Sequence, residues 1–100
     1  MMKIRIKFRK YGTMKFIGHL DVMRYFQKAI RRSEVNIRYS EGFSPHQIMS
    51  FAAPLGVGIT SKGEYVDIEV LDTENSKKMI DRLNAVMSEG FEILEYKLLP

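Results

Sequence analysis

The sequence predicts an α+β domain with the ferredoxin-like split βαβ arrangement, in which two helices cover one face of an antiparallel sheet. Two segments, 3–10 and 64–71, alternate apolar and charged side chains, which predicts half-buried strands. Two other segments carry apolar residues at helical spacing. The predicted order is strand, helix, strand, a loop with a strand, helix, strand. A length of 100 residues corresponds to one domain.

The first half of the chain contains a strand at 3–10, followed by an extended connection at 14–17. A helix is expected to begin near Gly18 and His19, where Gly18 serves as the N-cap. Its basic residues Arg31 and Arg32 fall in the last turn, where the helix dipole favours cations. We expect four apolar residues of this helix to face the core: Leu20, Met23, Phe26 and Ile30.

The second half begins after that helix. Gly90 is expected to follow the second helix at its C-terminal end. That helix carries an apolar stripe from Met79 to Met87. The elements are a short strand at 35–39, an irregular loop at 40–50, a strand at 51–55, a strand at 64–71, a helix opening at 72–73 and a last strand at 91–99.

Composition excludes several classes of protein. The chain has no cysteine, so it holds no disulfide, thiolate zinc site, cysteine nucleophile or iron–sulfur cluster of its own. No apolar run is long enough to span a bilayer, and the charged N-terminal segment is no signal peptide. We therefore expect a cytoplasmic domain with no membrane contact.

Charge is distributed unevenly along the chain. Residues 1–50 carry eleven Lys and Arg against three Asp and Glu, whereas residues 51–100 carry five against nine. This asymmetry indicates an anionic partner for the first half, or two halves that interleave and neutralise each other. The basic face of the first strand consists of Lys3, Arg5, Lys7 and Arg9. There we favour neutralisation within the sheet over binding of an anion, because Asp67 and Glu69 are expected across from Arg5 and Lys7.

A second basic surface lies on the first helix. Its cations fall on the side opposite the apolar stripe, and only Asp21 is close enough in sequence to pair with one of them. Such a ridge can bind the phosphates of RNA, or it can be a solvated helix face. The candidate nucleic-acid-binding residues are Arg24, Lys28, Arg31, Arg32 and Arg38.

The two histidines, His19 and His46, are candidates for chemistry. Together they could act as acid and base in RNA cleavage, they could bind a metal with Asp21 or Glu41, or they could hold loop backbone groups in place. We expect the start of the first helix and the 40–50 loop to lie at the same end of the sheet. The pocket that they form is expected to hold no metal. Phe43 is expected to anchor this loop in the core. The predicted ligand pocket is lined by His19, Asp21, Ser40, Glu41 and His46.

An ordered series of motifs extends from residue 16 to residue 65. It comprises Phe16, His19-Leu20-Asp21, Arg24, Arg31-Arg32, Tyr39-Ser40-Glu41-Gly42-Phe43, Pro45-His46, Ser50-Phe51, Pro54-Leu55, Gly58, Ser61 and Gly63-Glu64-Tyr65. With this series the chain resembles the radical SAM-linked domain, a bacterial domain of unknown function. Two positions depart from the family pattern: Gly18 replaces a serine, and Gln47 replaces a proline, which is expected to loosen the loop.

The resemblance implies an accessory role beside a radical SAM protein, in RNA modification or ribosome-related processing. It implies no cofactor in this chain, because the partner would carry its own cluster. The family domain is longer, so residues 1–100 are expected to be its N-terminal half. Our first hypothesis is therefore a binding module that recruits RNA or docks the partner. The alternatives are a histidine-dependent RNA-processing enzyme and a structural half-domain that needs its C-terminal portion.

Overall fold

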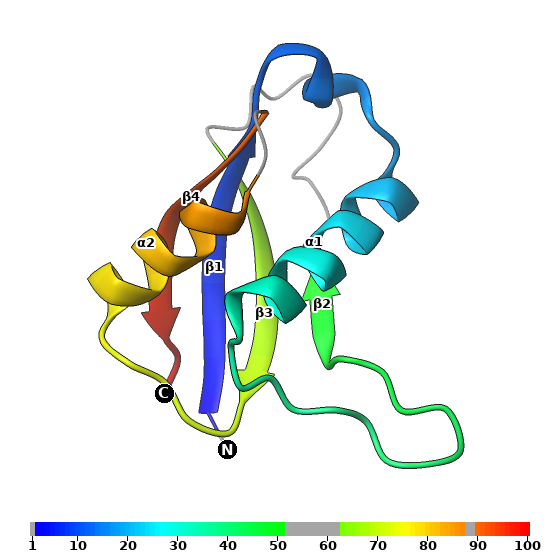
Figure 1. Ribbon diagram of the computed structural model, residues 1–100, viewed down its shortest axis with the longest axis vertical. Coiled ribbons are helices and arrows are strands. Elements are labelled where there is room, and N and C mark those ends of the chain that lie inside the picture. Colours follow the sequence, from blue (N-terminus) through cyan, green and yellow to red (C-terminus); the bar gives the residue numbers. More distant parts are fainter. Residues whose placement is uncertain (1, 52–62, 88–89) are drawn as a thin grey trace.

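Four antiparallel strands form a single sheet, and both helices pack against the same face of it (Figure 1). The strand order is β2-β3-β1-β4, which is the ferredoxin-like arrangement expected from the sequence. The computed structural model describes residues 2–51, 63–87 and 90–100, except for the side chains of Thr13, Lys15 and His19. The elements are β1 (Met2–Lys10), η1 (Gly12–Phe16), α1 (His19–Ser33), β2 (Met49–Phe51), β3 (Glu64–Val70), α2 (Ser76–Val86) and β4 (Phe91–Leu98).

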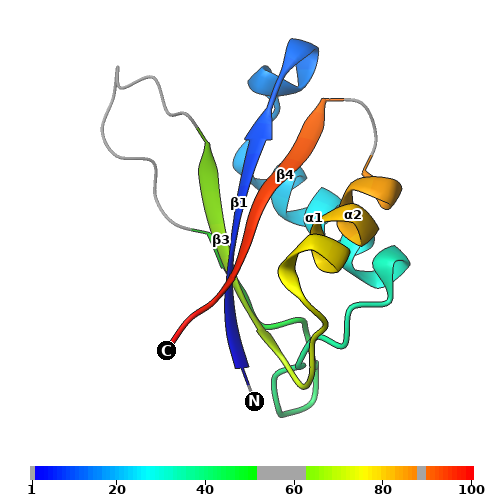
Figure 2. The ribbon, with the colours of Figure 1, turned by 90° about the vertical axis from the view of Figure 1, so that its left-hand side faces the viewer.

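The two alternating segments pair as predicted. β1 runs antiparallel to β3, with Ile4 opposite Ile68 and Ile6 opposite Val66. These four side chains are buried on the face that the helices cover. Figure 2 shows α1 and α2 together on one side of the sheet, and no described helix packs on the other face, which we call the open face. The period of two therefore determined both the pairing and the face that is buried.

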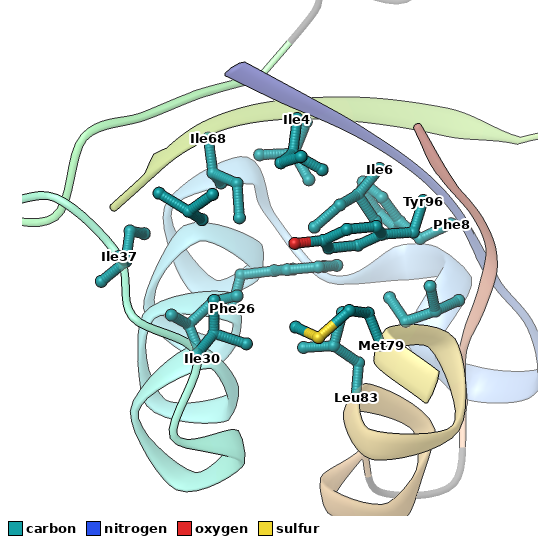
Figure 3. Packing of buried hydrophobic residues seen from close by; sticks show 14 of the residues in the cluster. Ile4, Ile6, Phe8, Phe26, Ile30, Ile37, Ile68, Met79, Leu83 and Tyr96 are labelled. Carbon is teal, nitrogen blue, oxygen red and sulfur yellow. The ribbon is translucent and has the colours of Figure 1, made fainter. Parts of the chain in front are cut away.

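The core lies between this sheet and the two helices (Figure 3). Phe8 of β1 and Phe26 of α1 meet with ring centroids 4.5 Å apart. Met79 and Leu83 of α2 complete the layer and are almost fully buried. Each large apolar side chain buried in this way stabilises the fold by about 1.5–3 kcal/mol. Within the described ranges, no helix is both long and apolar enough to pass through a bilayer.

The buried face of α1 is rotated from the one predicted. Val22, Phe26 and Ile30 are buried, whereas Leu20 remains 68% exposed. Met23 is only partly buried. Helical spacing fits more than one stripe when apolar residues are numerous. Packing against the sheet then selects the stripe that includes Val22 and Ala29.

The second helix begins later than predicted, because Asn75 caps it. The Asn75 side chain accepts a hydrogen bond from the Lys78 backbone N–H at 2.9 Å. Thr73, expected in the first turn, instead shares a 2.7 Å hydrogen bond with the hydroxyl of Tyr96. An Asn side chain at the N-cap satisfies one of the free amides of the first turn, so the helix begins at Ser76.

The segments around the predicted second strand also differ. Residues 35–39 form no strand, since only Ile37 and Tyr39 make isolated bridges. The short β2 occupies this edge, and residues 52–55 of the strand predicted at 51–55 lie outside the described residues. Residues 12–16 form the 3-10 helix η1 instead of an extended connection.

Candidate functional site

A hairpin-like excursion, residues 38–48, is inserted into the edge of the sheet next to β3. Ile37 pairs with Val70, and Met49 pairs with Ile68, so these two residues occupy nearly consecutive positions along β3. At Glu69, between them, the carbonyl accepts from the Arg38 N–H at 2.8 Å, and the N–H donates to the Ile48 carbonyl at 3.4 Å. The chain therefore leaves the sheet after residue 38 and returns at residue 48. We call this segment the 38–48 hairpin.

The hairpin has a hydrogen-bonded stem. The Ile48 N–H donates to the Arg38 carbonyl at 2.9 Å, and the Ser40 N–H donates to the His46 carbonyl at 2.8 Å. Tyr39 and Gln47 form an antiparallel bridge between these two bonds. Gly42 has a φ of 120°, a conformation that side chains rarely adopt, and it lies in the turn at the tip.

His46 closes this stem with its side chain as well as its backbone. The His46 N–H donates to the Ser40 hydroxyl oxygen at 3.1 Å, and Nδ1 lies 3.1 Å from the same oxygen. Nδ1 also lies 3.4 Å from the Ser44 carbonyl. The ring is exposed to solvent. These contacts support the interpretation that His46 satisfies the polar groups of the loop and holds it in place.

Gln47 fastens the hairpin to α1. Its side chain is only 6% exposed, and Nε2 donates to the Gln27 carbonyl at 3.2 Å. Its Oε1 is buried without a hydrogen-bond partner among the described residues. The sequence suggested that Gln47, in place of proline, loosens the loop. The structure instead shows a tether, which no sequence pattern around Gln47 indicated.

Phe43, at the tip, does not anchor the loop in the core as predicted. Its side chain is fully exposed. Figure 1 shows the 38–48 hairpin projecting away from the sheet and helices, so the tip has no core to enter. The stem and the Gln47 tether hold the hairpin in place, and the ring stays free for a partner.

The structure does not bring the two parts of the predicted ligand pocket together. Ser40, Glu41 and His46 lie in the 38–48 hairpin. Asp21 and the backbone of His19 lie in the first turn of α1, at the opposite end of the sheet (Figures 1 and 2). The His19 side chain lies outside the described part. The shared pocket was predicted because residues 35–39 were expected to cross the sheet before the loop. In the structure the 38–48 hairpin comes before β2, the strand that runs along this edge of the sheet. The hairpin therefore stays near the C-terminal end of α1.

The outer face of α1 carries the predicted cations. Four basic side chains lie along it, all exposed: Arg24, Lys28, Arg31 and Arg32. None of them forms an ion pair with any residue in the described ranges, 2–51, 63–87 and 90–100. Asp21 lies on the same helix, one turn before Arg24, and is also exposed. The surface is therefore a row of cations with a single carboxylate near one end.

The open face of the sheet has the opposite character. Arg5 donates two hydrogen bonds to the Asp67 carboxylate, at 2.9 and 3.0 Å, and this contact raises the pKa of Arg5. Arg9 pairs with Glu92 at 2.7 Å. Lys7 lies opposite Tyr65, with its ammonium 6.0 Å from the ring centroid. The predicted Arg5–Asp67 pair is thus confirmed, whereas Lys7 does not face Glu69.

Arg38 belongs to this internally paired group and not to the row on α1. Its guanidinium lies 3.1 Å from the Glu69 carboxylate, which is largely buried. The sequence placed Arg38 among the nucleic-acid-binding candidates, and the structure separates it from the row of cations on α1. The Arg38 backbone is hydrogen-bonded to that of Glu69, so the Arg38 side chain lies close enough to reach the Glu69 carboxylate.

Among the described residues, no three His, Asp or Glu side chains gather as a metal site would require. A family profile described as "Uncharacterized protein conserved in bacteria (DUF2344)" matches residues 3–100. The chain belongs to this family. Comparison with curated proteins and with solved structures gave no significant match. The bacterial DUF2344 family agrees with the bacterial domain expected from the motifs. Its description names no radical SAM protein, so that link stays a proposal.

Proposed function

We propose that this DUF2344 domain is a binding module that holds RNA through the outer face of α1 and acts beside a radical SAM enzyme. One observation carries the RNA proposal: Arg24, Lys28, Arg31 and Arg32 are exposed on one helix face and have no carboxylate partner among the described residues. The radical SAM partner rests on the sequence resemblance alone.

The spacing of these residues suits a polyanion. Arg24, Lys28 and Arg31 follow at four- and three-residue intervals, so they line one side of α1. Exposed cations that no internal carboxylate neutralises can neutralise RNA phosphates and release the counterions condensed on the RNA, which favours association. A contact with phosphates alone carries no base information, so this surface would hold RNA without selecting a sequence.

The enzyme alternative has less support. Acid–base cleavage needs both groups within reach of one substrate. The first turn of α1 and the 38–48 hairpin lie at opposite ends of the sheet (Figure 1). His46 is moreover engaged with Ser40. A binding role for the chain is therefore favoured over catalysis by His19 and His46 together.

The test is a salt titration of binding to a fluorescein-labelled oligouridylate, followed by anisotropy. The variant Arg24→Ala/Lys28→Ala/Arg31→Ala should weaken binding at least about tenfold at low salt. The magnitude of its log–log salt slope should fall by about 2, since each phosphate contact contributes roughly 0.7.

Lys77→Ala/Lys78→Ala on α2 is the control and is compared with Arg24→Ala/Lys28→Ala, which also removes two cations; both lysines are exposed and lie on a different helix. This pair should bind as the unmodified chain does. Equal losses in the two variants would reduce the effect to net charge. An affinity that does not respond to salt, or no binding at low salt, would overturn the proposal.

A further inference from the structure

The tip of the 38–48 hairpin presents an aromatic ring entirely to solvent. Phe43 is the most exposed large apolar side chain in the described part of the protein. Covering such a ring removes apolar surface from water, which is favourable, so an exposed ring at a projecting tip is a surface that a partner can use. Each face of the ring could stack on a planar group.

The ring is also held in position before any partner arrives. The stem hydrogen bonds and the His46–Ser40 contacts fix the two strands of the hairpin. Gly42, with a φ of 120°, sets the turn directly before Phe43. A preorganised contact loses less conformational entropy on binding than a flexible one does.

The charges around the hairpin indicate which partner fits. Gln47 ties the stem to the backbone of Gln27, which is followed by Lys28 and, one turn later, by Arg31. The hairpin is therefore attached to α1 between Arg24 and Lys28, within the cationic row. At the tip itself, the exposed carboxylate of Glu41 repels phosphate, so contact with a base is favoured there over contact with the backbone.

We propose that Phe43 is the position at which an unpaired RNA base stacks, while the neighbouring phosphates lie along the cations of α1. This inference rests on the function proposed above and adds the substrate class: RNA with unpaired bases. Stacking on an aromatic ring tolerates any base, because every base has a π-face. A duplex of equal length keeps its bases stacked inside and would gain nothing from Phe43.

The experiment uses Phe43→Leu and Phe43→Trp in the whole chain, with oligouridylate as the probe. Phe43→Leu should weaken binding by about five- to a hundredfold, which corresponds to about 1–3 kcal/mol. Phe43→Trp should keep the affinity. The chain has no tryptophan, so the introduced indole is a unique reporter. Its emission should be quenched by oligouridylate and unchanged by inorganic polyphosphate, which has phosphates but no bases.

Tyr65→Leu is the matched control, since this ring lies on the open face of the sheet, opposite Lys7. It should leave affinity unchanged. If Phe43→Leu binds normally while Arg24→Ala/Lys28→Ala/Arg31→Ala loses binding, the stacking site is wrong and the proposed function stands. Equal quenching by polyphosphate would also overturn stacking. Absence of RNA binding by the unmodified chain would overturn both. Because Phe43 is fully exposed, its variants should melt at the temperature of the unmodified chain.

Discussion

The open face of the sheet and the outer face of α1 each carry a row of four cations, yet they differ in what those cations contact. On the sheet, Arg5 and Arg9 are paired with Asp67 and Glu92 of the neighbouring strands, whereas Lys3 and Lys7 form no ion pair with a described residue. On α1, Arg24 and Lys28 have no carboxylate partner among the described residues. A strand lies between other strands, whose side chains reach its own, whereas the outer side of a helix faces solvent. Net charge therefore does not locate a binding surface; unpaired charge does.

The uneven charge of the two halves of the chain is partly neutralised by ion pairs between them. The acidic second half supplies Asp67, Glu69 and Glu92, and all three neutralise cations from the first half. The ion pairs confirm the interleaving of the two halves, whereas an anionic partner for the first half stays a prediction. The halves interleave on the sheet, and an excess of positive charge remains on α1.

The largest expected difference comes from removing equal charge from the two surfaces. Arg24→Ala/Lys28→Ala should weaken binding to oligouridylate about tenfold or more at low salt and leave the melting temperature nearly unchanged. Arg5→Ala/Arg9→Ala should leave binding nearly unchanged and lower the melting temperature slightly, because it removes two exposed ion pairs, with Asp67 and Glu92. Anisotropy and thermal melting monitored by circular dichroism measure the two effects. If both pairs of substitutions weaken binding equally, then the cations of α1 and those of the sheet do not differ as binding surfaces.

A smaller effect tests whether the sheet is held by its buried face rather than by its surface charges. Tyr96→Phe removes the hydrogen bond between the Tyr96 hydroxyl and Thr73 and should lower the free energy of unfolding by about 1 kcal/mol at neutral pH. Tyr65→Phe, on the open face, should have little effect. Urea denaturation measures both variants.

Tyr96 also predicts a pH dependence. Burial raises the pKa of Tyr96, so the folded state retains the phenol proton more strongly than the unfolded state does. Its contribution to stability is complete below about pH 10, the ordinary tyrosine value, and is lost as the pH rises through the higher folded pKa. Tyr96→Phe should remove this alkaline component. A variant that loses stability in parallel with the unmodified chain above pH 10 would contradict the assignment.

The smallest expected effect concerns the single carboxylate in the first turn of α1. Asp21 is the acidic residue in its first turn and lies near Arg24. Asp21→Asn should tighten binding to oligouridylate about twofold, because a charge that repels phosphate is removed. The same change should reduce stability by a few tenths of a kcal/mol, since a carboxylate near the helix N-terminus is favourable. Weaker binding would instead indicate that Asp21 orients Arg24.

Sequence alone determined the elements whose side chains repeat with a regular period. The alternation in β1 and β3 predicted their pairing and the face that the helices cover, although of the expected cross-strand partners only Arg5 and Asp67 lie opposite each other. The cations of α1 were found in the same way, because positions opposite a buried stripe face solvent. These features are local, since each follows from which side of one element a residue occupies.

Only the tertiary structure decided how the irregular segment between α1 and β3 is arranged. Residues 35–39 have the composition of a strand, but the chain leaves the sheet at residue 38, and Met49 resumes the pairing with β3. This choice separated the start of α1 from His46, left Phe43 exposed and directed Arg38 to Glu69. It depends on the competition of two segments for one edge of β3. That competition is settled by long-range contacts such as the Gln47 tether to α1, which the period of neither segment encodes.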